Sequence, residues 1–279
     1  MATRQGGAAA RAGQERYTQG YGTAVVAHMA QRTAEREAAF FLPHLRPGMR
    51  LLDLGCGPGT ITLGLARAVA PGEVVGIDCE PSMVEQARAL ATERGVANVR
   101  FEVADATALP FPEGTFDAAF EHTLLEHVPD PVAVLRELRR VVKPGGVLGL
   151  RDVDVESRVT EPDTPLLEEA FGLYGRLMQH NGGHLTLGRR QRTLLRDAGI
   201  ARAETSAGAT TFGTPDATRA WAELRAGLLE GPRFAEQVIA LGWTDRASIA
   251  RWAQAIRAWG GHPDAVWAEL VFQTVAWVT

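Results

Sequence analysis

Residues 51–60, LLDLGCGPGT, carry the pattern with the clearest chemical meaning in this sequence. An apolar run ends in glycines at alternate positions, Gly55, Gly57 and Gly59, and a helical pattern follows from Thr60. Glycines spaced in this way let the chain turn sharply and let a ligand come close to the backbone N–H groups. The segment therefore predicts a ligand-binding turn between a buried strand and a helix.

Three kinds of ligand are compatible with such a turn. A phosphate-binding P-loop ends in Gly-Lys-Ser/Thr, but the only lysine of the chain is Lys143. A dinucleotide-binding turn has a third glycine at the position that Thr60 occupies here. The third ligand is S-adenosylmethionine (SAM), and the residues that end the following apolar runs favour it.

Two acidic residues support SAM because they follow the next two predicted strands. Asp78 ends the run at 73–78, where a carboxylate can accept hydrogen bonds from both ribose hydroxyls. Asp105, followed by Ala106, ends the run at 99–105, where a carboxylate can accept from the adenine amino group. A second acid that contacts adenine is not part of the dinucleotide pattern.

Further residues complete the predicted cofactor site. Asp53 and the amides of the glycine loop lie where the methionine part of SAM, with its ammonium and carboxylate, would bind. Cys79 and Met83 can pack on the faces of adenine, and Cys56 is expected to be a small loop residue rather than a nucleophile. Glu121 ends a later apolar run at the same edge. Structural roles, as turn formers or helix caps, are the alternative for the glycines and acids.

The elements that must position these residues alternate along the chain. Apolar runs that read as strands lie at 50–55, 73–78, 99–105, 115–121 and 147–154, and helical patterns lie at 60–70, 81–95 and 130–146. Continuous apolar strands separated by helices predict a parallel sheet that is covered on both faces. Such sheets bind their ligands at the carboxyl ends of the strands, so the predicted site residues should lie side by side.

These motifs resemble those of class I SAM-dependent methyltransferases, above all the branch of the ubiquinone/menaquinone-biosynthesis methyltransferases. The resemblance covers residues 45–155 and rests on LLDLGCGPGT, VVGIDCEPSMVEQAR, FEVADATALPFPEGTFDAAFEHTLLEHVPDP and LRELRRVVKPGGVLGLRD. It implies an α/β, Rossmann-like, doubly wound sheet of seven strands in the order 3-2-1-4-5-7-6, with the last strand antiparallel. It also implies SAM as cofactor, S-adenosylhomocysteine (SAH) as product, and Gly55, Gly57, Gly59, Asp78, Asp105 and Ala106 as cofactor contacts.

Four segments are expected within one compact domain. They are a mobile terminus at 1–15, a helical lid at 16–44, the SAM-binding core at 45–155, and a helical cap with the last strands at 156–279. In the lid, the rings of Tyr17 and Tyr21 stand beside flexible glycines and can close over the sulfonium, because a ring face attracts a cation. Packing on the outside of the sheet is the alternative for these two rings.

Methyl transfer itself requires little covalent chemistry, because the methyl group of a sulfonium is already activated. The enzyme must align the acceptor and exclude water, and a base helps if the acceptor is a hydroxyl, an acidic carbon or an amine. His122 and His127 follow the run at 115–121 and are the candidate bases, with loop positioning as the alternative. The candidate contacts of the acceptor are Asp152, Asn181 and His184. The histidine spacing does not match a metal site, so no metal is predicted.

The composition of the chain limits the classes of partner that the sequence predicts. The net charge is -4 and the arginines alternate with acids, which argues against nucleic acid. No apolar run reaches the length of a membrane span, and the first residues lack the apolar segment of a secretion signal, so a cytoplasmic location is expected. All six tryptophans lie between residues 221 and 277, where they are expected to pack a helical cap. If some of the rings line a pocket, the acceptor is apolar and sizeable. A homo-oligomer is compatible with the sequence.

The predicted function is therefore O- or C-methylation of a small, largely apolar metabolite, with natural-product biosynthesis as one setting. Two alternatives remain open. One is C-methylation of a quinone precursor, and the other is a regulator that binds SAM without catalysis.

Overall fold

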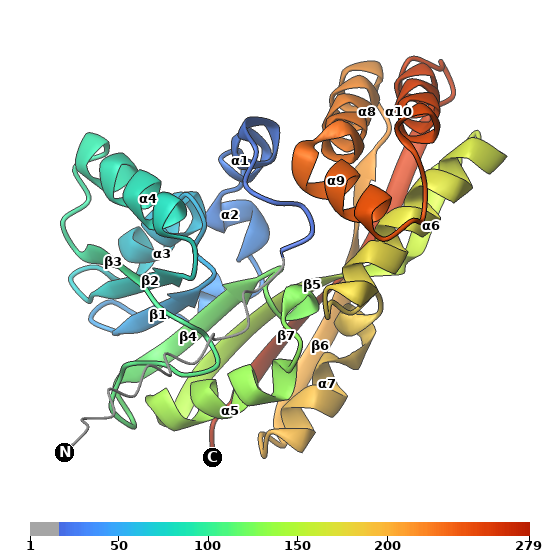
Figure 1. The fold of residues 1–279 in the computed structure, drawn as a ribbon. Coiled ribbons are helices and arrows are strands. Elements are labelled where there is room, and N and C mark those ends of the chain that lie inside the picture. The colour runs from blue at the N-terminus through green and yellow to red at the C-terminus, as the bar shows by residue number, and fades with distance from the viewer. Residues whose placement is uncertain (1–16) are drawn as a thin grey trace, which may run out of the picture.

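A single mixed sheet forms the centre of the protein. The computed structural model describes residues 17–279, so the prediction of a mobile terminus at 1–15 lies outside the described residues. The sheet has seven strands in the order β3-β2-β1-β4-β5-β7-β6 (Figure 1). Strands β1 to β5 are parallel, and β7 runs antiparallel to both β5 and β6. This confirms the predicted fold class, strand order and antiparallel last strand.

The strands and helices follow the predicted alternation closely. The strands are β1 Leu51–Leu54, β2 Val74–Asp78, β3 Val99–Val103, β4 Phe116–His122, β5 Val142–Glu161, β6 Arg202–Phe212 and β7 Val266–Trp277. The helices are α1 Thr23–Met29, α2 Ala34–Glu37, η1 Leu42–His44, α3 Thr60–Val69, α4 Pro81–Glu93, η2 Leu125–His127, α5 Pro131–Val141, α6 Pro165–His180, α7 Leu187–Asp197, α8 Pro215–Glu230, α9 Pro232–Ala240 and α10 Arg246–Gly260. In Figure 1, α3 and α4 lie on one face of the sheet, and α5 and α7 lie on the other.

Two boundaries differ from the prediction around β5. The helix expected to run to residue 146 ends at Val141, because the Pro-Gly-Gly that follows cannot continue it. The strand expected to end at residue 154 continues to Glu161, where it still pairs with Val266 of β7. The sheet is therefore longer on this side than the sequence predicts, and the extra length carries the cap.

The N-terminal segment also differs in detail. In the segment predicted as a helical lid at 16–44, the first helix begins at Thr23, and residues 30–33 separate it from α2. Helix α2 packs closely on α3, since a Cβ atom added at Gly64 would lie 2.5 Å from the Cβ of Ala34. The segment is thus anchored at α2, and α1 extends from this anchor toward α8.

The cap forms a second apolar cluster beside the main core. Helices α6, α8, α9 and α10 stand over the outer ends of β5, β6 and β7, as Figure 1 shows. The cluster contains four of the tryptophans, Trp221, Trp252, Trp259 and Trp267, as buried residues. None of the helices in the described part of the chain combines the length and apolar character needed to cross a membrane.

Candidate functional site

The carboxyl ends of the central strands border a cavity of about 1370 Å³. The lining comes from the loops after β1 to β4, from the lid, and from the ends of α6 and α9. The predicted site residues that line it are Tyr17, Tyr21, Asp53, Gly55, Cys56, Gly57, Asp78, Cys79, Asp105, Ala106, His122, His127 and Asn181. Those outside the lining are Gly59, Met83, Glu121, Asp152 and His184.

The glycine loop needs glycine for its backbone conformation. The φ angles of Gly55, Gly57 and Gly59 are +66°, +50° and +84°, in the left-handed region that other residues rarely adopt. At Gly59 a Cβ atom would also lie 2.9 Å from the Cβ of Ala87, so this glycine lets α3 approach α4. Gly55 and Gly57 are therefore the glycines at the ligand cavity, whereas Gly59 serves the packing behind it.

The carboxylate of Asp78 joins the first two strand ends. The backbone N–H of Gly57 donates to Oδ2 over 2.9 Å, and the backbone N–H of Glu80 donates to Oδ1 over 2.9 Å. These two bonds fix the orientation of the carboxylate at the cavity. Asp78 is thus positioned at the cavity by backbone groups of two loops.

Asp105 is held in a similar way at the end of β3. Its Oδ1 accepts from the backbone N–H of Thr107 over 2.8 Å and from the Thr107 hydroxyl over 2.7 Å. The two bonds fix a tight turn, which presents the neighbouring Ala106 to the cavity. This geometry fits the predicted recognition of an adenine edge.

Asp53 is buried at the base of the glycine loop. The hydroxyl of Thr62 donates to its Oδ2 over 2.6 Å. Burial raises the pKa of Asp53 to about 7 despite this bond. A cationic group bound nearby would lower that pKa again, which is the electrostatic fit expected for an ammonium.

Met83 does not reach this cavity. It is 1% exposed and belongs to the apolar layer under α4, because it lies on the helix face that packs on the sheet. Cys79 is exposed at the cavity, and the hydroxyl of Tyr21 lies 3.9 Å from its Sγ. Of the two residues predicted to contact adenine, the structure brings only Cys79 to the cavity.

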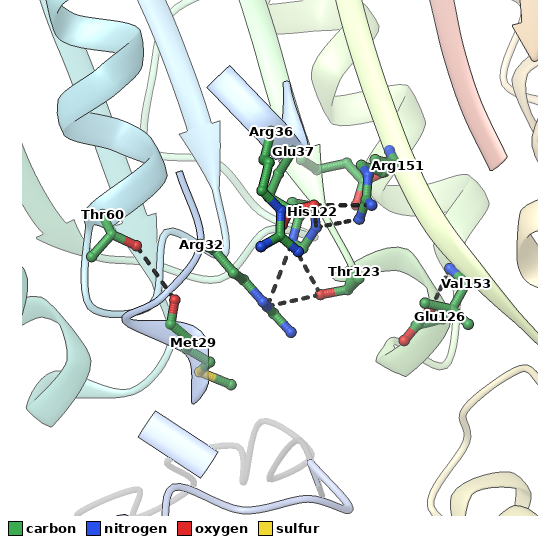
Figure 2. Close-up of polar contacts among 11 residues, drawn as sticks. Met29, Arg32, Arg36, Glu37, Thr60, His122, Thr123, Glu126, Arg151 and Val153 are labelled. Carbon is green, nitrogen blue, oxygen red and sulfur yellow. Dashed lines mark hydrogen bonds and ion pairs between the residues drawn. The ribbon is translucent and has the colours of Figure 1, made fainter. Parts of the chain in front are cut away.

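The lid lies over the glycine loop. The hydroxyl of Thr60 donates to the carbonyl of Met29 over 3.4 Å, as Figure 2 shows. The rings of Tyr17 and Tyr21 line the cavity with their centroids 5.2 Å apart, and the Tyr17 ring meets the ring of His127 edge to face at 4.7 Å. Both tyrosines therefore face the cavity and do not pack on the outside of the sheet.

His122 belongs to a charged network that joins the lid to the sheet. A guanidinium nitrogen of Arg151 lies 2.6 Å from its Nε2, and Glu37 of α2 pairs with Arg151 at 2.9 Å (Figure 2). Glu37 also lies 3.6 Å from Nε2, and a guanidinium nitrogen of Arg32 lies 3.5 Å from Nδ1. Both ring nitrogens thus contact charged side chains, which assigns His122 to this network.

The pKa values in this network agree with that assignment. Burial lowers the pKa of His122 to about 3, so the ring is neutral near pH 7. Burial pushes the pKa of Glu37 upward, but the hydrogen bond with His122 and the charge of Arg151 outweigh it and lower the pKa to about 2. The network thus contains one stable buried ion pair and a neutral imidazole.

His127 is the histidine whose environment suits a base. Its ring lines the cavity, and its Nε2 lies 3.3 Å from Oε1 of Glu126. The other oxygen of Glu126 accepts from the backbone N–H of Val153 over 2.8 Å, so the carboxylate is fixed (Figure 2). The sequence prediction missed Glu126, although its place directly before a candidate base was a usable signal.

Three predicted site residues stand behind the cavity. Glu121 and Asp152 are completely buried, and burial raises the pKa of both, that of Asp152 to about 7. The side chain of Asp152 accepts from the backbone N–H of Glu126 over 3.3 Å, and Nε2 of His184 lies 3.1 Å from the carbonyl of Val128. These residues support the loop that carries His127.

Within residues 17–279, no three His, Cys, Asp or Glu side chains are grouped for a metal ion.

Arg32 and Gln237 line the cavity without having been predicted. Arg32 places a guanidinium nitrogen 3.5 Å from the hydroxyl of Thr123, which follows β4. Gln237 of α9 donates to Asn181 over 2.6 Å, and Asn181 donates to the hydroxyl of Thr18 over 3.0 Å. The sequence carries no signal for these contacts, because they join segments that are far apart along the chain.

Comparison with known proteins gives a consistent result. A family model described as a methyltransferase domain matches residues 45–199. An uncharacterised methyltransferase of Schizosaccharomyces pombe is 34% identical over 212 residues, which cover 74% of this chain and 76% of that protein. A demethylmenaquinone methyltransferase of Lactococcus lactis is 40% identical over 128 residues, which cover 46% of this chain and 48% of that protein.

Solved structures share the fold. The YcgJ protein of Bacillus subtilis has a TM-score of 0.60 and 23% identity, with 88% of this chain and 99% of that chain covered. SpnF, which is described as a cyclase, has a TM-score of 0.53 and 26% identity, with 89% and 80% covered.

Proposed function

Because the chain belongs to the methyltransferase domain family and is a SAM-dependent methyltransferase, we propose that it methylates a small, largely apolar metabolite at oxygen or carbon. The observation that carries the proposal is that one cavity is lined both by the cofactor motifs and by residues of the lid and cap. Its volume of about 1370 Å³ exceeds the roughly 300–1,000 Å³ of a typical ligand pocket, which leaves room for two molecules.

The residues of the cavity fit SAM in chemical type. Asp78 would accept from the ribose, Asp105 and Ala106 would meet the adenine, and Asp53 would face the ammonium group. We add Arg32 as the counter-charge for the methionine carboxylate, since it lines the same cavity as the glycine loop. When bound, SAM supplies a methyl group on a positively charged sulfur.

Residues of the chain would remove the proton from the acceptor and exclude water. We assign His127 as the base that removes a proton from the acceptor, and Glu126 as the residue that orients its ring. The ring of Tyr17 packs on His127 and excludes water from the reacting groups. His122 is assigned a positioning role, because both of its ring nitrogens contact charged side chains of the lid and the sheet.

The test begins with the purified protein. Mass spectrometry should detect bound SAM or SAH, and labelled SAM should then transfer its methyl group to members of a panel of phenols, enols and quinols. Transfer to RNA or protein with no transfer to any small molecule would overturn the proposal.

The same panel of acceptors distinguishes the proposed function from two alternative functions. Quinone-precursor C-methylation draws support from the demethylmenaquinone methyltransferases, although the match covers less than half of this chain. It predicts that prenylated quinols are the only acceptors. A SAM-binding protein without methyl transfer is the other alternative, since a similar fold occurs in a protein described as a cyclase. It predicts bound SAM and no labelled product.

A further inference from the structure

Two acidic side chains behind the cofactor cavity lie against each other. Glu121 lies near the end of β4 and Asp152 lies in β5, and a hydrogen bond joins their carboxyl groups. Both residues are 0% exposed. Within residues 17–279 neither forms a salt bridge, since the guanidinium of Arg151 pairs with Glu37 on the opposite face of β5. The pair is therefore buried without a cation to balance two negative charges.

The four carboxyl oxygens of this pair already have other donors. They accept, over 2.9 to 3.3 Å, from the backbone N–H groups of Arg151, Leu124 and Glu126 and from the side-chain amide of Gln191. Because a carboxylate can only accept, the bond between Glu121 and Asp152 needs a proton of its own. Two like charges in contact at a buried site also favour the uptake of one proton.

We propose that Glu121 and Asp152 share one proton and together position the loop that carries His127. The proposal rests on the proposed function, in which His127 is the base. Burial and the neighbouring carboxylate raise the pKa of Glu121 well above its usual range, so Glu121 donates and Asp152 accepts. Glu126 is the other acid that faces the pair, and its charge adds to the effect of burial on the pKa of Asp152.

The pair fixes this loop at two points. Glu121 accepts from the backbone N–H of Leu124, and Asp152 accepts from that of Glu126. The side chain of Glu126 is in turn held by β5, because its Oε2 accepts from the backbone N–H of Val153 over 2.8 Å. Its Oε1 then lies 3.3 Å from Nε2 of His127. Loss of the pair should therefore displace the base and leave the strand-end loops that face the cofactor in place.

The first test detects the shared proton itself, by infrared spectroscopy of the full chain at pH 9. At this pH Asp53 and Glu269, whose pKa burial raises to about 7, are ionised. We expect the carbonyl stretching band of a protonated carboxyl group, its loss in Glu121→Gln and its retention in Asp154→Asn. Asp154 is the matched control, because it is equally buried in the same strand but accepts from Arg189 over 2.6 Å. Absence of the band from the unchanged protein, or its persistence in Glu121→Gln, would overturn the proposal.

The second test measures the effect of the pair on the loop. Asp152→Leu is similar in size but cannot accept from Glu126, so kcat should fall about tenfold or more, while the SAM affinity measured by calorimetry stays within about twofold. Asp152→Asn keeps an acceptor oxygen and should restore kcat to within about threefold of the unchanged protein. Full kcat in Asp152→Leu, or equal losses in the two variants, would contradict the positioning role.

Failure of the proposed function gives a different result. If His127→Ala keeps full kcat while the unchanged protein shows the infrared band and Glu121→Gln does not, the assignment of the base is wrong and the shared proton is retained.

Discussion

In the loops after β2 and β3, the site residues bond mainly to nearby backbone N–H groups, whereas His122 at the end of β4 bonds to side chains of distant segments, including the lid. Asp78 accepts from two backbone N–H groups, and Asp105 accepts from one backbone N–H and one nearby hydroxyl. In contrast, His122 depends on Arg151 and on Glu37, which comes from α2. The first group is fixed by local chain geometry, and the second is complete only when the lid is in place.

This difference separates two properties of the enzyme. Cofactor binding should depend on the strand-end loops, and turnover should depend on the contacts that join lid, cap and sheet. Variants of the two regions should therefore change different measured quantities. The following predictions test that separation, beginning with the largest expected effect.

The largest effect is expected at His127. Its replacement in His127→Ala should lower kcat by about 100-fold or more, the usual range for loss of a general base, and leave the affinity for SAM nearly unchanged. Steady-state kinetics and calorimetry measure the two quantities. Glu126→Gln should lower kcat less and displace the acidic limb of the pH–rate profile. If His127→Ala keeps full kcat, alignment alone drives the reaction.

Asp78→Ala should have the next largest effect, on binding. It removes bonds to the ribose and also releases the backbone N–H of Gly57, so SAM affinity should fall by roughly 2–3 kcal/mol. Asp105→Asn is the milder comparison, because an amide oxygen can still accept from Thr107 and from adenine. Calorimetry that shows the two variants to be equally weak, or Asp78→Ala to be unchanged, would contradict the cofactor assignment.

The anchor of the lid should affect turnover more than binding. Glu37→Gln removes the charge that pairs with the buried Arg151, and we expect kcat to fall about tenfold as the lid loosens. Glu35→Gln is the matched control, because Glu35 lies in the same helix and pairs with Arg67 on the surface. A tenfold loss in both variants would mean that α2 as a whole, not the buried pair, was disturbed.

Some of the site residues can be predicted from the sequence, and others cannot. The glycines, Asp78 and Asp105 follow strands directly, so their place at one sheet edge follows from the alternation of strands and helices. Glu121 lies outside the lining of the cavity for a local reason. Successive side chains of a strand point to opposite faces, so Glu121 cannot share the cavity with His122.

The lid network could not be predicted in the same way. Arg32 contacts a residue 91 positions away, and no local pattern marks which arginine of the N-terminal segment will do so. The same holds for Glu126 and Val153, whose bond depends on how the loop after β4 meets β5. Such pairs are set by tertiary packing, which composition and periodicity do not encode.

The pH dependence of stability offers a further test of the lid network. The pKa of His122 is about 6.5 in the unfolded chain and about 3 when folded, so the unfolded state takes up a proton first as pH falls. Stability from this residue is therefore present above pH 6.5 and lost progressively toward pH 3. The melting temperature of the unchanged protein should fall as the pH is lowered from 6.5 toward 3. This fall should be smaller in His122→Gln, whereas His262→Gln, which replaces a surface histidine, should leave it unchanged. Identical pH curves for all three proteins would contradict the assignment.

The smallest effect concerns the contact between lid and cap. Asn181 accepts from Gln237 of α9 over 2.6 Å, donates back to it over 3.3 Å and donates to Thr18 of the lid, so it joins the two segments over the cavity. Hydrogen bonds of this kind contribute about 1 kcal/mol each, so Asn181→Ala should raise the KM for the acceptor about fivefold or more and leave SAM affinity unchanged. A double-mutant cycle with Gln237→Ala should give a coupling energy of similar size, because either change removes both bonds between the two amides. If the two effects simply add, the pair does not act as a unit. A coupling seen in KM but absent from SAM binding would show that the cap side of the cavity serves the acceptor.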